Sequence, residues 1–270
     1  MFLSFKIAPF MGLFFLCVNF LNAAPKKEKK PLDRRQIYCS RFEKNGSLAS
    51  FLRPYTGRIY SKNDGGFFNQ GVCWWHSRFQ RASAYLSYFV PEAEAVKDPE
   101  EIRKIVRAII GQKDLVLING FNNMLQFSYA WKEIIQEELE KWQLRDSLHG
   151  KWINGLKGKW TFGPQGYWDG NAKNMEKTLD QTYELFLKGQ LPFQILQIPG
   201  IEAHAWLIRN MVKTKVGYQL SIIDSNQGEE EYEYKRGMNF ITYREKRAVL
   251  YSAFEAEAEN LQQIFRKYCQ

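Results

Sequence analysis

The spacing of apolar residues switches near residue 190 of this chain, and that switch is the strongest constraint on its fold. Up to residue 187 the apolar residues recur three and four positions apart, which predicts helices. From Phe193 to about residue 252 they form short runs with Pro and Gly at several boundaries, which predicts strands, before a closing helix. Helices followed by strands indicate an α+β fold and not alternating strand and helix units.

The helices and strands can be placed approximately from their boundary signals. Asp98-Pro99-Glu100-Glu101 is a strong helix start, and Pro91 is expected to end the helix before it. Helices are expected from Cys73 to about 90, from 98 to about 110, and over 119–140, 171–187 and 254–268, with an irregular segment over 144–170. Strands are expected over 193–198, 203–211, 218–223, 231–234, 239–242 and 248–252.

Residues 1–23 have the pattern of a secretory signal peptide. Lys6 is their only charged side chain, most of the rest is apolar, and small residues stand near Ala23. An uncleaved membrane anchor is the alternative, but the apolar stretch is interrupted and shorter than the roughly 20 residues that span a bilayer. We therefore expect a secreted or periplasmic protein, with no stable membrane insertion after signal removal.

A short basic linker is expected over 24–36, before one domain over 37–270. The chain has 38 Lys and Arg against 29 Asp and Glu, a net charge of +9 that becomes +8 without Lys6. The linker contributes +4 of this, from six basic and two acidic residues. We interpret it as a solvated tether, and we expect no nucleic-acid partner because the sequence contains no nucleic-acid-binding motif. A domain of this length suits a monomer.

Three cysteines remain after signal removal, so in an oxidising compartment one thiol is left over. Cys39 and Cys269 lie near the two ends of the expected domain, and the ends of a domain are often close in space. We predict a disulfide between Cys39 and Cys269 and a free thiol at Cys73.

That free cysteine precedes two further groups in the order that a thiol nucleophile requires. Cys73 begins an expected helix, whose N-terminus favours a thiolate. His204 follows 131 residues later in an expected strand, between two alanines. Asp224 and Asn226 close the next strand, and either side chain can orient an imidazole. Each residue taken alone also fits a structural role: a buried cysteine, a core histidine and an ordinary turn.

Other histidines are weaker candidates for the base. His76 follows Cys73 too closely along the same helix, and His149 lies in a loop pattern. The spacing of His, Cys, Asp and Glu suggests no zinc site, and we expect neither a metal nor another cofactor.

The chain resembles the papain-like cysteine peptidase superfamily over roughly residues 60–225. The resemblance rests on the order of Gln70-Gly71-Val72-Cys73-Trp74-Trp75, His204-Ala205-Trp206 and Asp224-Ser225-Asn226. It implies a helical N-terminal lobe, an antiparallel β-sheet lobe and an active site in the cleft between them. It also implies Cys73 as nucleophile, His204 as base and Asp224 or Asn226 as the group that orients it. Papain itself carries an oxyanion Gln six residues before the Cys, where this chain has Phe67. Gln70, three residues before Cys73, either takes that role or only forms part of a turn.

These observations predict an exported thiol hydrolase, a cysteine peptidase or amidase that acts on a peptide or protein. A transglutaminase-like acyl transferase and a non-catalytic secreted binding protein are the alternatives. The acidic run from Glu229 to Glu233 is either a solvated segment or a surface that selects basic substrates, and 160–168 is either a substrate lip or a packed loop.

Overall fold

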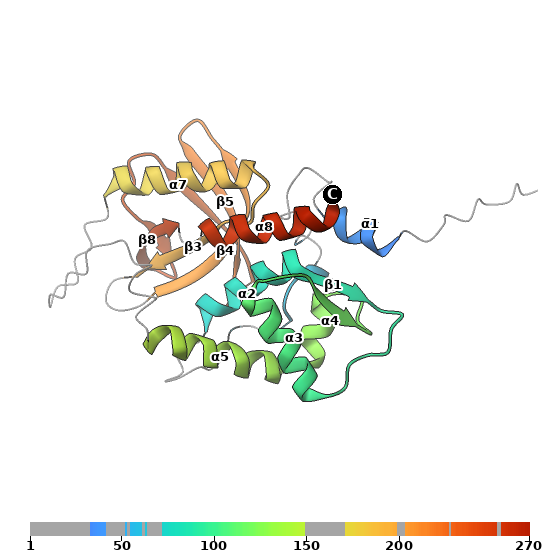
Figure 1. Cartoon of the computed structure of the whole chain (residues 1–270). Coiled ribbons are helices and arrows are strands. Elements are labelled where there is room, and N and C mark those ends of the chain that lie inside the picture. The colour runs from blue at the N-terminus through green and yellow to red at the C-terminus, as the bar shows by residue number, and fades with distance from the viewer. Residues whose placement is uncertain are drawn as a thin grey trace, which may run out of the picture. The chain divides into compact units, whose positions relative to one another are not determined.

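A computed structural model describes residues 33–41, 52, 55–60, 63, 72–148, 171–198, 203–226, 228–252 and 255–270 (Figure 1). Residues 33–270 form one compact unit. The expected signal peptide lies outside the described residues, as does the linker up to residue 32, and the first described helix begins at Arg34.

The described elements confirm an α+β fold in which most helices precede most strands. The helices are α1 (Arg34–Cys39), the short 3-10 helix η2 (Tyr55–Gly57), α2 (Cys73–Leu86), α3 (Pro99–Gly111), α4 (Met124–Ala130), α5 (Lys132–Leu148), α7 (Ala172–Leu187) and α8 (Glu255–Cys269). The strands are β1 (Ser87–Val90), β2 (Val116–Asn119), β3 (Phe193–Gln197), β4 (Ala203–Lys213), β5 (Gly217–Asp224), β6 (Gly228–Lys235), β7 (Ile241–Tyr243) and β8 (Lys246–Ser252).

The C-terminal strands form one antiparallel sheet in the order β6-β5-β4-β3-β8-β7. Its two edge strands approach each other, since the rings of Tyr232 in β6 and Tyr243 in β7 lie 6.4 Å apart. The sheet is therefore nearly closed. β1 and β2 form a separate parallel pair in the helical part.

The two faces of the large sheet are covered by different helices, because side chains alternate between the faces along a strand. On one face, Ile195, Ala205 and Leu207 belong to the apolar core that also contains residues of α2 and α8. On the other face, Leu196, Trp206 and Ile208 pack with residues of α7. Figure 1 shows α7 and α2 on different sides of the strands. α2 is consequently held between the sheet and the rest of the helical part.

The helix expected from Cys73 begins at that residue but ends earlier than expected. It stops at Leu86, and Phe89, which we had assigned to it, lies in β1. Residues Ser87–Val90 alternate between buried and half-buried positions and pair with Val116–Asn119. Aromatic and β-branched side chains favour this extended pairing over another helical turn.

The single helix expected over 119–140 is wrong in two respects. Asn119 ends strand β2, and the helical segment after it is split into α4 and α5. Trp131 separates them, with φ −126° and ψ 29°, outside helical values. The second helix then continues to Leu148, into the segment that we expected to be irregular. The α3 and α7 starts are confirmed, with Asp98 and Asn171 as N-caps.

A buried ion-pair cluster joins α2 to α8. Glu257 accepts hydrogen bonds from Arg81, at 2.5 Å, and from Arg78, and Arg78 also reaches Asp146 of α5 at 3.4 Å. Burial alone would raise the pKa of Glu257, but the two guanidinium groups lower it to about 2. The carboxylate therefore stays charged at neutral pH, and the cluster fixes how α2 lies against the C-terminal helix.

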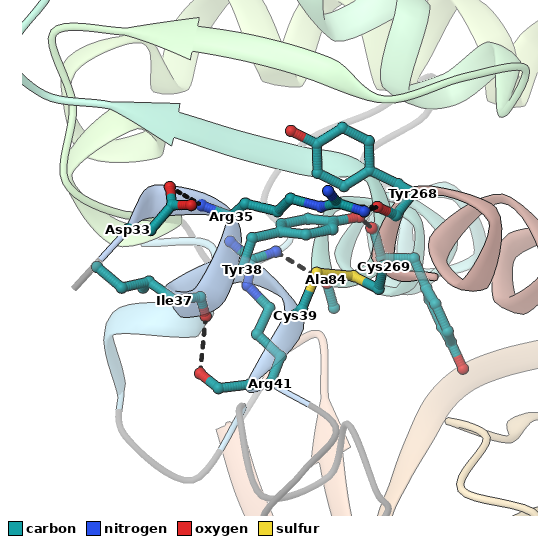
Figure 2. Close-up of a disulfide and its surroundings, with 11 residues drawn as sticks. Asp33, Arg35, Ile37, Tyr38, Cys39, Arg41, Ala84, Tyr268 and Cys269 are labelled. Carbon is teal, nitrogen blue, oxygen red and sulfur yellow. Dashed lines mark hydrogen bonds between the residues drawn. A yellow bond between two sulfur atoms is a disulfide. The ribbon is translucent and has the colours of Figure 1, made fainter.

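The predicted disulfide between Cys39 and Cys269 is confirmed, and Cys73 is the free cysteine of the described residues. Figure 2 shows the bond between α1 and the last residue of α8. Around it the Arg35 guanidinium donates to the carbonyl of Tyr268, at 2.9 Å, and Arg41 donates to the carbonyl of Ala84, at 3.2 Å. The two ends of the domain are thus joined covalently and by hydrogen bonds.

Removing this disulfide is expected to destabilise the domain strongly. The bond links residues 230 positions apart, and closing so long a loop restricts the unfolded chain. The chain-entropy model gives about 5 kcal/mol for such a loop. We expect the double variant Cys39→Ser/Cys269→Ser to unfold at a clearly lower denaturant concentration than the parent. The reduced parent is the control and should match the variant; an unchanged unfolding midpoint would contradict the prediction.

In the described part of the chain, no helix is both long enough and apolar enough to cross a membrane.

Candidate active site

Cys73 is the first residue of α2, and two hydrogen bonds set its place beside strand β4. The Cys73 thiol lies 3.8 Å from the carbonyl oxygen of Ala203, and one turn later the Ser77 hydroxyl donates to the carbonyl of Ala205 at 3.1 Å. The backbone N–H of Cys73 belongs to the first helical turn, whose amides have no carbonyl partner within the helix. The nucleophile candidate therefore combines a helix N-terminus with direct contact to the strand that carries His204.

His204 and Asp224 lie on the same face of the sheet because of the strand register. Trp206 of β4 pairs with Asp224 of β5, so His204, two positions before Trp206, is a diagonal neighbour of Asp224. His204 Nε2 lies 2.6 Å from Asp224 Oδ2, and the Asp224 side chain is fully buried. A carboxylate can only accept, so Nε2 carries the proton and Nδ1 is the ring nitrogen left for Cys73.

The charges of this pair follow from its contacts. Burial alone would lower the pKa of His204, but the hydrogen bond to Asp224 and the interaction with the Cys73 side chain raise it to about 9. Burial alone would likewise raise the pKa of Asp224, yet its hydrogen bonds, above all that with His204, keep it below the ordinary value. At neutral pH the site therefore holds an imidazolium between the Asp224 carboxylate and the Cys73 side chain.

Asn226, the other candidate for the third residue, has a different role. β5 ends at Asp224, and Asn226 lies in the turn that follows. Its backbone N–H donates to Asp224 Oδ1 at 2.7 Å, while its side-chain oxygen accepts from Asn63 at 2.8 Å. The side chain that reaches His204 is that of Asp224, and Asn226 supports it through the backbone.

Of the other sequence candidates, the structure describes only His76. Gln70 and His149 lie outside the described residues, so the site contains no described oxyanion glutamine. His76 is buried in α2, one turn after Cys73. The segment 160–168 is also outside the described residues. Among the described residues, no group of three or more His, Cys, Asp or Glu side chains could hold a metal ion.

The acidic run from Glu229 to Glu233 lies in strand β6 and is partly used in structural contacts. Glu229 forms ion pairs with Arg58 and with Arg209, the latter at 3.3 Å. Glu230 accepts a hydrogen bond from the hydroxyl of Tyr232. The first acidic residue of the run thus connects the N-terminal segment to the sheet.

Two residues at the site were missed by the sequence analysis. The Asn63 side chain accepts from the backbone N–H of Val72, and the Asn63 backbone N–H donates to the carbonyl of Ser225 at 2.8 Å. It therefore links the residue before Cys73 to the turn after Asp224. Tyr243 donates to Asp224 Oδ2 at 3.0 Å. A polar residue in a Gly-rich segment was the only signal for Asn63, and no local signal marked Tyr243.

No protein family matches the sequence, and no curated protein and no solved structure is significantly similar to it. The chemistry of the site must therefore be inferred from its own residues.

Proposed function

We propose that this protein is an exported cysteine peptidase or amidase, a divergent member of the papain-like superfamily, with Cys73 as nucleophile and His204 as acid and base. The observation that carries the proposal is the buried hydrogen bond of 2.6 Å between His204 and Asp224, next to a cysteine at a helix N-terminus. The substrate would reach these residues in a cleft between the helical part and the sheet. Export is supported by the signal-peptide pattern and by the disulfide.

The arrangement of groups suits acyl transfer in two steps. In the first step the Cys73 thiolate attacks the carbonyl carbon, the C–N bond breaks, and His204 gives its proton to the departing amine. The product is a thioester on Cys73. In the second step His204 removes a proton from water, the hydroxide attacks the thioester, and the thiolate leaves. The net reaction adds one water across one amide bond.

In this scheme backbone N–H groups stabilise the negatively charged oxygen of the tetrahedral intermediate. The backbone N–H of Cys73 is at the start of α2, where amides have no carbonyl partner within the helix, and it belongs to the same residue as the thiol. It is therefore a candidate donor to this oxygen. Asp224 keeps the proton of His204 on Nε2 when the ring is neutral, so that Nδ1 faces the reacting atoms.

The rate of hydrolysis is expected to fall as the pH rises through a midpoint near pH 9. Hydrogen bonding and charge raise the pKa of His204 to about 9, so the imidazolium that protonates the amine is present below this pH and is lost above it. We would measure kcat/KM from pH 5 to 10 on a mixed peptide library, with products identified by mass spectrometry. The rate of Cys73 alkylation by iodoacetamide would be measured at pH 7 in parallel.

His204→Gln is the control for both measurements. This variant should lose most of the activity, and the fall of kcat/KM near pH 9 should disappear. Alkylation should slow by about tenfold or more, because the Cys73 thiolate loses the neighbouring imidazolium. If no peptide is cleaved and alkylation is equally fast in both proteins, the proposed function is wrong and a binding role replaces it. Incorporation of an added amine in place of water would instead identify an acyl transferase.

A further inference from the structure

Tyr243 contacts both members of the His204–Asp224 pair. It is the last residue of the edge strand β7 and is 2% exposed. Its hydroxyl donates to Asp224 Oδ2 at 3.0 Å, and this is the same oxygen that accepts from His204 Nε2. Its ring is stacked on the imidazole, with centroids 5.1 Å apart and planes inclined by 20°. One side chain thus touches the carboxylate and covers one side of the imidazole.

The position of Tyr243 is fixed by its surroundings. The edge of the Trp206 indole meets its ring at 5.9 Å, and the ring of Tyr232 lies 6.4 Å away. The tight turn after Tyr243 consists of Arg244 and Glu245, both with positive φ, of 48° and 64°. Non-glycine residues adopt such values at a cost and keep them where the surrounding structure imposes them. The turn therefore holds Tyr243 at the end of β7, against the site.

A carboxylate oxygen that accepts two hydrogen bonds interacts less strongly with each donor than it would with one alone. While the Tyr243 hydroxyl donates to Asp224 Oδ2, less of the carboxylate charge acts on the imidazole beside it. The hydroxyl remains a donor throughout the working pH range, because burial and the nearby Asp224 charge raise the pKa of Tyr243 above its ordinary value. The charge that His204 experiences is consequently set by two residues and not by Asp224 alone.

We propose that Tyr243 is a positioning residue of the Cys73–His204–Asp224 site, one that holds the carboxylate in place, keeps the imidazole plane fixed and limits how tightly Asp224 retains the imidazolium. This inference rests on the proposed function for its kinetic consequences, but not for its structural ones. Without the hydroxyl, Asp224 holds the proton on His204 more strongly, so the proton passes less readily to the departing amine.

The groups facing His204 come from three elements. Asp224 approaches from β5, Cys73 from α2 and Tyr243 from β7. Tyr243 itself is flanked by Tyr232 of β6, with ring centroids 6.4 Å apart, and by the guanidinium of Arg244, 5.2 Å from its ring. The Tyr243 hydroxyl donates to Asp224 Oδ2, and substitution by phenylalanine removes this contact while it keeps the ring.

Tyr243→Phe tests the proposal because it removes the hydroxyl and keeps the stacked ring. We expect kcat to fall by about tenfold with KM changed less than about twofold, and the alkaline midpoint to rise by about 0.5 to 1 pH unit. Tyr232→Phe is the matched control. It removes the hydroxyl of a neighbouring tyrosine that donates to Glu230, and it should leave both kcat and the midpoint unchanged.

The protonation of His204 can be followed without any substrate, by NMR titration of the imidazole in protein labelled at histidine. The midpoint should rise in Tyr243→Phe and stay unchanged in Tyr232→Phe. In an Asp224→Ala background the added Tyr243→Phe should have no further effect, because the proposed action passes through Asp224. An unchanged midpoint, or an effect that persists without Asp224, would overturn the inference.

Failure of the proposed function is separable from failure of this inference. If the protein cleaves no peptide but the imidazole titration shifts as described, Tyr243 still sets the charge of the pair and the hydrolase assignment alone is wrong. If hydrolysis is observed and the titration does not shift, the assignment stands and the role of Tyr243 is only structural.

Discussion

Cys73→Ala is expected to lower kcat/KM for amide hydrolysis by about 10⁴-fold or more. Loss of a covalent nucleophile leaves only the contribution of substrate binding and of oxyanion donors, which is small compared with that of the intact set. Cys73 is 8% exposed, so the substitution removes one sulfur from a nearly buried site and adds no bulk. The measurement is the initial rate of cleavage of the best peptide from the library screen.

Two controls distinguish loss of the nucleophile from loss of the fold. Cys73→Ala should unfold at nearly the parent denaturant concentration, which shows that the loss is chemical. Cys73→Ser should be nearly as inactive, because a hydroxyl is far harder to ionise than a thiol. Retention of more than about one per cent of the parental activity in Cys73→Ala would exclude Cys73 as the nucleophile.

Asp224→Ala is expected to lower kcat/KM by about 10³- to 10⁴-fold, the second largest effect. The carboxylate selects the His204 tautomer and stabilises the imidazolium, and losses of this size follow when such a carboxylate is removed from a triad. Since the hydrogen bond to Asp224 helps to raise the pKa of His204, the alkaline midpoint should also move to lower pH in the variant. Both quantities come from one pH–rate profile.

Asn226→Ala is the matched control for Asp224. Its side chain contacts Asn63, whereas its contribution to Asp224 comes from the backbone N–H, which alanine retains. We expect a loss of at most about tenfold and an unchanged alkaline midpoint. Equal losses in the two variants would show that the turn after β5, and not the carboxylate itself, is what the reaction needs.

The sequence by itself determined the class of the fold and the ends of several elements. Local signals were sufficient for this: the cap at Asp98, the cap at Asn171 and the strand pattern from Phe193 each depend on residues close in the chain. The disulfide also followed from the sequence, because three cysteines allow few pairings and two of them lie near the domain ends. The predictions failed where a long-range partner decided the conformation, as when Val116–Asn119 converted the end of the expected helix into β1.

Which of Asp224 and Asn226 has its side chain against His204 was decided only by the tertiary structure. The two residues are two positions apart and follow the same apolar run. If the strand continued through both, their side chains would lie on the same face of the sheet. The strand instead ends at Asp224, and the register with β4 brings that residue next to His204.

Tyr243 shows the same limit of sequence reasoning more clearly. It lies 39 positions after His204 in the chain, yet it is stacked on the imidazole. Its place depends on the near closure of the sheet, which brings the edge strand β7 towards β6 and over the paired strands β4 and β5. Such a contact is set by the twist and register of strands distant in sequence, so no local pattern specifies it. The sequence therefore supplied the candidate reactive groups in their order, and the tertiary structure decided which side chains contact them.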